Sequence, residues 1–153
     1  GEENAVTGYC AQVAEVIIDD ETGQITLTKL TTAHDTGTII NPIGHQGQIN
    51  GGAMMGIGFG LQEELVKENG YISTLSFADY KIPNIADIPE LRTVILDTPA
   101  QGVGPYNIKA IGESPNAPTA AAITNAIADA VGTRIKDLPA TAEKVYLALN
   151  ENK

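Results

Sequence analysis

The sequence predicts an α+β fold, in which a largely antiparallel sheet forms one layer and packed helices form a second layer. Three observations support this prediction. Two runs rich in β-branched residues flank a short linker that contains glycine, residues 43–64 are rich in glycine yet of helical length, and an alanine-rich stretch near the C-terminus carries apolar side chains every four residues. We find no internal repeat, and the length of 153 residues favours a single domain over residues 1–153.

The two β-prone runs are residues 9–18 and 24–33. Small or apolar side chains occupy one alternating face of the first run: Cys10, Ala14, Val16 and Ile18. Gln12 is the polar exception on that face. The linker between the runs reads DDETG, which predicts a hairpin with a solvated turn. An EF-hand is excluded because glycine at the sixth and glutamate at the twelfth position of a calcium loop are both missing.

A glycine-rich helix is expected next, over residues 43–64. Each glycine in a helix interior costs about 1 kcal/mol relative to alanine, so close packing must offset the cost. Gly52, Gly56 and Gly60 are spaced four apart and would form a smooth groove on one face. Two interpretations stay open: tight packing of the helix on the sheet, or close approach of the helix to a cofactor.

Turn and loop residues divide the middle of the chain. A turn is predicted at Asn69-Gly70, and strands are predicted over 71–77 and 91–96. Pro83 and Pro89 indicate a loop between these strands, and residues 98–105 predict another loop.

The last third of the chain predicts two helices. Ser114 and Pro115 suit the N-cap and first position of an alanine-rich helix. Its buried stripe is spaced every four residues: Ile123, Ile127 and Val131. Gly132 is a typical residue just past a helix C-terminus, and Thr141 is expected to cap a final helix that ends near residue 150.

Composition excludes several classes of function. The formal net charge is −10 and the nine basic residues are scattered, which disfavours nucleic-acid binding. One cysteine and two histidines offer neither a disulfide nor a recognised zinc motif, so no protein-ligated metal is expected. No apolar run is long enough to span a membrane, and the acidic first residues do not form a signal peptide. We expect a cytoplasmic protein.

Two acidic positions are candidates for chemistry. The pair His34-Asp35 at the end of a predicted strand is more typical of a hydrogen-bonded structural pair than of a general base. Glu113 lies between Gly112 and the predicted helix start at Ser114. The positive helix end would lower the pKa of Glu113 and burial among apolar side chains would raise it, a balance that suits a general base. The alternative, which spacing alone favours, is a first-turn glutamate that only complements the helix dipole.

Three stretches of the sequence resemble one family. They read AHDTGTIINPIGHQGQINGGAMMGIGFGLQEEL from residue 33, FADYKIPNIADIPE from residue 77 and KAIGESPNAPTAAAITNAIADAVG from residue 109. In this order and spacing they resemble the C-terminal part of the molybdenum-binding subunit of the xanthine dehydrogenase and aldehyde oxidase family. The resemblance covers nearly the whole chain from Tyr9 onward.

The resemblance implies a role for particular residues. Glu113, in the Gly-Glu-Ser-Pro motif, matches the family's general base, which takes the proton from the hydroxide ligand of a molybdenum centre. Gln48, which follows Gly47, matches the glutamine that hydrogen-bonds the pterin of a molybdenum–pyranopterin cofactor. This molybdopterin occurs with or without an appended nucleotide, such as the cytosine dinucleotide form.

The resemblance also implies partners. Members of the family oxidise an aldehyde or an N-heterocycle and pass electrons through 2Fe-2S clusters to FAD. These groups would lie on partner domains or subunits, together with the upstream part of the molybdenum subunit, so this chain alone is expected to be inactive. The alternative is a non-catalytic assembly or interaction domain that retains the fold.

Overall fold

A three-stranded sheet with the order β1-β2-β5 forms one layer of the fold. The computed structural model describes residues 7–96 and 105–151. β1 (Tyr9–Ile18) and β2 (Ile25–Asp35) pair antiparallel, which confirms the predicted hairpin. β5 (Glu90–Ile95) confirms the strand predicted over 91–96. It pairs parallel to β2, because the long connection between the two strands returns the chain to the same end of the sheet. The sheet is therefore mixed.

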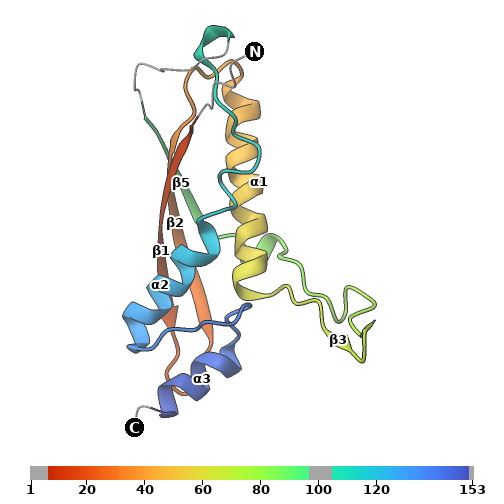
Figure 1. The fold of residues 1–153 in the computed structure, drawn as a ribbon. Coiled ribbons are helices and arrows are strands. Elements are labelled where there is room, and N and C mark those ends of the chain that lie inside the picture. The colour runs from red at the N-terminus through yellow and green to blue at the C-terminus, as the bar shows by residue number, and fades with distance from the viewer. Residues whose placement is uncertain (1–6, 97–104, 152–153) are drawn as a thin grey trace.

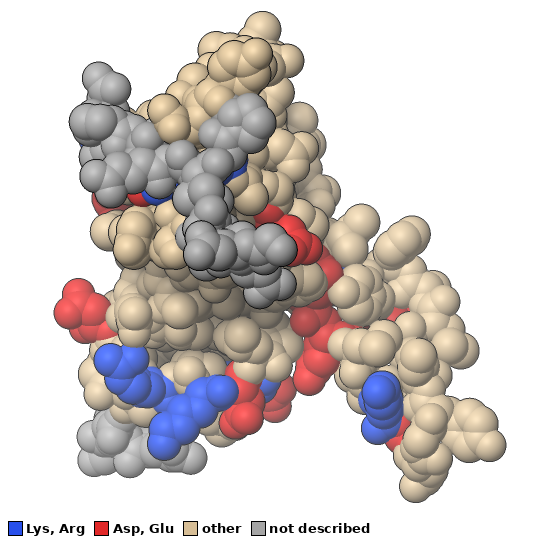
Figure 2. Space-filling model, turned by 45° about the horizontal axis from the view of Figure 1, so that its top comes forward, with Lys and Arg blue, Asp and Glu red and all other residues tan. Residues whose placement is uncertain are grey.

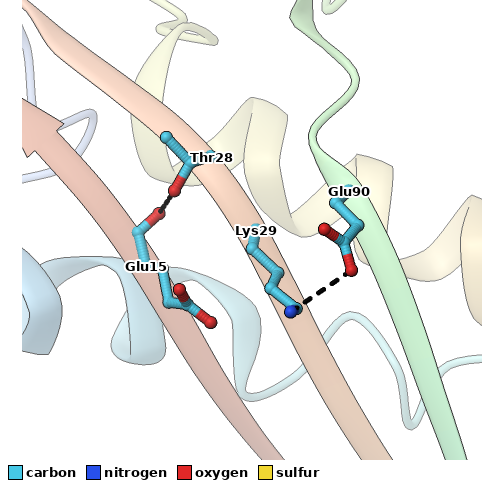
Figure 3. Close-up of polar contacts among 4 residues, drawn as sticks. All are labelled: Glu15, Thr28, Lys29 and Glu90. Carbon is cyan, nitrogen blue, oxygen red and sulfur yellow. Dashed lines mark hydrogen bonds and ion pairs between the residues drawn. The ribbon is translucent and has the colours of Figure 1, made fainter.

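A β-bulge in the hairpin changes which side chains of β2 face the core. Glu15 lies opposite Lys29 and Val16 opposite Leu27, so Thr28 is the extra residue. The Thr28 hydroxyl donates to the Glu15 carbonyl oxygen at 3.0 Å (Figure 3). The bulge shifts the alternation by one residue, and Leu27 and Leu30 consequently both pack into the core. Nothing in the hydrophobic pattern predicted it.

Two helices form the second layer, α1 (Pro42–Leu61) and α2 (Thr119–Val131), and both run along one face of the sheet (Figure 1). α3 (Ala142–Glu151) closes the far end of this layer. The layers meet in a continuous apolar cluster of buried side chains: Leu27, Leu30, Ala53, Ile57, Ile123, Ile127, Ala140 and Val145. The predicted α+β layer structure is confirmed, and so is the predicted buried stripe of α2.

Two helix ends lie where the sequence predicts them, at Gly132 and at Thr141. The sequence predicts the glycine-rich helix over 43–64, whereas α1 spans Pro42–Leu61. Asn41 caps α1 by accepting from the Gly44 N–H at 3.0 Å. Gly132 ends α2 in the left-handed conformation, with φ 75°. Thr141 caps α3 by accepting from the Lys144 N–H at 3.3 Å.

The predicted start of α2 at Ser114-Pro115 is wrong. Residues 113–118 form consecutive turns, in which the Asn116 N–H donates to the Glu113 carbonyl oxygen at 3.1 Å. The helix begins at Thr119, directly after Pro118. A second proline in this position explains the late start, because the residue before a proline is held out of the helical conformation.

Residues 62–84 form an arm that stands away from the two layers (Figures 1 and 2). β3 (Lys67–Glu68) and β4 (Tyr71–Ile72) pair in it around the Asn69-Gly70 turn, as predicted for that turn. The strand predicted over 71–77 is wrong beyond Ile72, because the following residues have no partner strand and Phe77 is 77% exposed. Between the arm and β5, Ile85–Asp87 form a short 3-10 helix within the predicted loop.

The loop predicted for residues 98–105 lies, apart from Pro105, outside the described residues. In the parts of the chain that the structure describes, none of the helices has the length and apolar character needed to cross a membrane.

Candidate functional site

Gly52, Gly56 and Gly60 of α1, here called the glycine row, determine which segment packs against this helix. A methyl group on Gly52 would lie 3.0 Å from Pro115 Cβ, and one on Gly56 would overlap Thr119 Cβ. At Gly60 the same group would lie 3.3 Å from Ile123 Cδ1. The groove is therefore filled by the start of α2 and the turns before it. It serves neither helix–sheet packing nor cofactor approach, the two roles considered from the sequence, but helix–helix packing.

This packing has a fixed direction and register. Successive glycines of α1 contact residues that come progressively later in the chain, so α1 and α2 run parallel. Both the glycines and their contact residues are spaced four apart. Gln48 lies four residues before Gly52 on the same face of α1, and it contacts Gly112. A methyl group added to Gly112 would lie 4.0 Å from Gln48 Oε1. Gln48 is thereby placed beside the residue that precedes Glu113.

The N-terminal half of α1 also has an open edge. Added methyl groups on Gly47 and Gly51 would meet no atom within 4 Å, and Gly47 and Gln48 are exposed. The predicted cofactor-binding residues Gly47 and Gln48 therefore lie on an accessible edge, next to the segment that carries the predicted base. The structure thus brings Gln48 next to Gly112, the residue before Glu113, from segments far apart in sequence.

Glu113 itself differs from the prediction in its surroundings. Its side chain is exposed, and no side chain in residues 7–96 or 105–151 forms a hydrogen bond or ion pair with its carboxylate. α2 begins only at Thr119, so Glu113 is not in the first turn of a helix. The predicted burial of Glu113 and its predicted position at a helix start are therefore both wrong for this chain.

A cavity of about 190 Å³ lies beside Gln48. The capped N-terminus of α1 lines it through Asn41, Gly44 and His45, and the strand-like segment with Ile108 and Lys109 lines the opposite side. The N–H groups of Gly44 and His45 in this wall already donate to Asn41, so the exposed Gln48 amide is the group that offers hydrogen bonds to a polar heterocycle. These residues fit one part of a pterin cofactor site. Sequence reasoning did not single out His45 and Lys109, although both lie inside the quoted stretches.

The polar side chains next to the cavity are buried and hydrogen-bonded, except that His34 Nδ1 has no partner among the described residues. Lys109 Nζ lies 2.7 Å from Asp35 Oδ2, and both side chains are nearly buried. His34 is fully buried, and its Nε2 is hydrogen-bonded to Thr32 Oγ1 at 2.6 Å. These contacts confirm the structural interpretation of the His34-Asp35 pair. Within the described residues, no group of three or more His, Cys, Asp or Glu side chains could hold a metal ion.

The two histidines make folding stability depend on pH. Burial lowers the pKa of His34, with a smaller contribution from the charge of His45, and burial also lowers the pKa of His45. The folded state therefore binds fewer protons than the unfolded state once the pH falls below about 6.5, the ordinary value for histidine. Stability present above that pH is lost as the pH falls toward the lowered values.

We expect the free energy of unfolding to decrease below about pH 6.5, by at most about 1.4 kcal/mol per pH unit for each histidine. Urea unfolding at a series of pH values measures this slope. His34→Gln should reduce the slope of unfolding free energy against pH without abolishing it, because His45 still contributes. An unchanged slope in His34→Gln would show that His34 does not titrate on unfolding.

Fold and site together define a class of protein. The parallel helix pair on the sheet leaves the Gln48 amide exposed beside the segment that carries Glu113. The profile of the molybdopterin cofactor-binding domain family matches residues 1–89. The chain belongs to this family, in the form found in molybdenum-binding subunits of xanthine dehydrogenases and aldehyde oxidoreductases.

Individual relatives agree with this assignment. The chain is 34% identical to the xanthine dehydrogenase molybdenum-binding subunit of Escherichia coli O157:H7, over 86% of this chain and 18% of that subunit. It is 39% identical to the large subunit of nicotine 6-hydroxylase of Paenarthrobacter nicotinovorans, over 87% of this chain and 17% of the relative. The solved aldehyde oxidoreductase of Desulfovibrio gigas superposes with a TM-score of 0.84 at 36% identity, over 94% of this chain and 15% of that one. The chain thus spans less than a fifth of each of these relatives.

Proposed function

We propose that this chain supplies the general base and part of the pterin site of a molybdenum hydroxylase that oxidises an N-heterocycle or an aldehyde with oxygen derived from water. The observation that supports the proposal is that Gln48 lies against Gly112, the residue directly before Glu113. Relatives named for xanthine, nicotine and aldehyde support the substrate class.

Each residue would have a distinct task. When bound, the molybdopterin cofactor supplies the molybdenum centre that accepts electrons from the substrate. The Gln48 amide carries both a donor and an acceptor, which suits a heterocycle that presents both. Gly47 leaves room for close approach, since a Cβ there would fill space that is now open. The Glu113 carboxylate would take up the proton of the attacking, water-derived hydroxyl group, as a general base.

The rest of the enzyme belongs to the same proposal. Electrons would leave through 2Fe-2S clusters and FAD on partner domains or subunits, because one cysteine cannot ligate a cluster. The upstream part of the molybdenum subunit would cover the open edge and remove Glu113 from solvent. The cofactor would be molybdopterin, with the cytosine dinucleotide form as one version. A single free cysteine suits the cytoplasm, and the isolated chain would be inactive.

One purification tests this proposal against the alternative of a non-catalytic assembly domain. The protein is isolated from its native source, the mass of its complex is measured, and molybdenum is assayed. A large complex that contains molybdenum is the expected result. A metal-free assembly of this chain alone would overturn the proposal and favour the assembly domain.

Replacement of Gln48 tests its binding role. In the assembled enzyme, Gln48→Ala should lower molybdenum and pterin content, because the exposed amide is lost while no buried contact changes. Removal of one hydrogen bond to a polar ligand corresponds to roughly 10-fold weaker binding. Gln24→Ala, which changes an exposed glutamine in the hairpin, is the matched control and should leave the content unchanged. Full occupancy in Gln48→Ala would exclude the assigned role.

A further inference from the structure

Gln12 is an amide on the core-facing side of β1, where its neighbours along the strand are small or apolar. A polar side chain in this position is costly unless it finds hydrogen-bond partners. It is the polar exception in an otherwise regular alternating pattern.

The Gln12 amide nitrogen reaches from the sheet to the segment that carries Glu113. It donates to the Pro115 carbonyl oxygen at 2.7 Å and lies 3.2 Å from Thr32 Oγ1. Thr32 Oγ1 is in turn hydrogen-bonded to the buried His34 ring at 2.6 Å. A buried polar chain thus connects β2, through Gln12, to a backbone atom two residues after Glu113.

Pro115 is held from other directions as well. Its ring is fully buried and its Cβ lies against Gly52 of α1. Its carbonyl oxygen also accepts from the Thr119 hydroxyl at 2.9 Å. The backbone beside Glu113 is therefore fixed by the sheet on one side and by α1 on the other, while the carboxylate itself projects into solvent without a partner among the described residues.

The energetics of Gln12 do not explain it as a stabilising residue. Its Oε1 is buried without a hydrogen-bond partner, which is unfavourable. If Gln12 were lost, Pro115 O would keep the bond from Thr119 and Thr32 Oγ1 would keep the bond with His34, so neither partner would be orphaned. An apolar side chain of the same length would thus serve stability about as well.

We propose that Gln12 is a positioning residue that sets the placement of the Glu113 carboxylate by anchoring the Pro115 carbonyl to the sheet. The inference rests on the proposed function of Glu113 as the base. Gln12 acts through the backbone of residues 113–116 and touches neither substrate nor cofactor. Misplacement of a reacting group by about 1 Å can cost on the order of 100-fold in rate.

The test uses Gln12→Met in the molybdenum-loaded enzyme. We expect kcat to fall by about 10- to 100-fold with an unchanged KM and unchanged molybdenum content. Hydrogen–deuterium exchange of peptides that cover residues 113–116 should become faster, and this second measurement does not depend on turnover. The thermal midpoint should stay close to that of the parent protein.

Two controls separate placement from stability. Ile127→Val trims a fully buried side chain of α2 away from this segment, and should lower the midpoint without changing kcat or the exchange of residues 113–116. Gln24→Met repeats the chemical change at an exposed glutamine and should change neither. If Gln12→Met does not fold, Gln12→Asn replaces it, because the shorter amide cannot span the same distance.

The outcomes are distinguishable from those of the proposed function. An unchanged kcat or unchanged exchange in the Gln12 variant overturns this inference alone, provided that Glu113→Gln is inactive. Loss of molybdenum in the Gln12 variant also overturns it, because Gln12 would then act on cofactor binding. Activity retained in Glu113→Gln overturns the proposed function, and the exchange measurement still reports whether Gln12 anchors the segment.

Discussion

Glu113→Gln should reduce turnover of the assembled enzyme to background while its molybdenum content stays unchanged. Glutamine keeps the shape of the side chain but cannot accept a proton, so only the chemical step is removed. Positioned general bases contribute about 10²- to 10⁴-fold to rate. Steady-state rates and metal analysis on the same preparation measure the two quantities.

The structure makes this substitution a clean one. The Glu113 side chain is exposed and has no hydrogen-bond or ion-pair partner among the described residues, so its replacement should leave folding unchanged. Glu21→Gln in the exposed hairpin turn removes the same charge far from the site and serves as the control. If Glu113→Gln turns over at the parental rate, Glu113 is not the base and the assembly-domain alternative gains support.

Gly56→Ala should lower stability although it adds only one methyl group to α1. The added carbon would overlap Thr119 Cβ and lie 3.0 Å from the Asn116 carbonyl oxygen, so α2 must move away from α1. Overpacking of this kind costs about 1–3 kcal/mol, which exceeds the roughly 1 kcal/mol that alanine gains over glycine in a helix. Displacement of residues 116–119 would also move Glu113, so activity should decrease with stability.

Gly51→Ala is the matched control for this prediction. It places the same methyl group in the same helix, but no atom lies within 4 Å of it. The helix propensity of alanine should therefore stabilise this variant by up to about 1 kcal/mol. Urea unfolding of both variants gives the difference. Equal stability of the two variants would mean that the glycine row does not set the distance between the helices.

Much of the fold follows from local patterns in the sequence. Alternating β-prone residues and the acidic turn predict the hairpin, and the capping residues Asn41 and Thr141 lie where the helices begin. Strand β5 is also predicted, but not its parallel pairing, because a strand's direction depends on the path of the connection before it. The bulge at Thr28 escaped prediction for a similar reason, since it is a property of the pairing of two strands.

The candidate site is predicted by resemblance and not by local patterns. Resemblance to a family predicts roles for Gln48 and Glu113, and the structure adds that Gln48 lies against Gly112, the residue before Glu113. The partner of the glycine row could not be predicted, because small residues at helical spacing show that something approaches closely without showing what it is. The sequence misplaces the start of α2 because Ser114-Pro115 suits a helix N-terminus locally, whereas Pro118 is the N-cap and the helix begins at Thr119.

The glycine row has a consequence for how the site tolerates insertions and deletions. Each four-residue step along α1 corresponds to about 6 Å of helix, and α2 can interlock with it only at whole steps. A residue inserted between Glu113 and Thr119 cannot be accommodated by a small shift of α2 along α1. At an intermediate position, side chains of α2 would clash with side chains of α1 that lie between the glycines. The backbone of Glu113 is thereby kept in register with the exposed edge of α1 that carries Gly47 and Gln48, and insertions or deletions are expected in the arm and not in this segment.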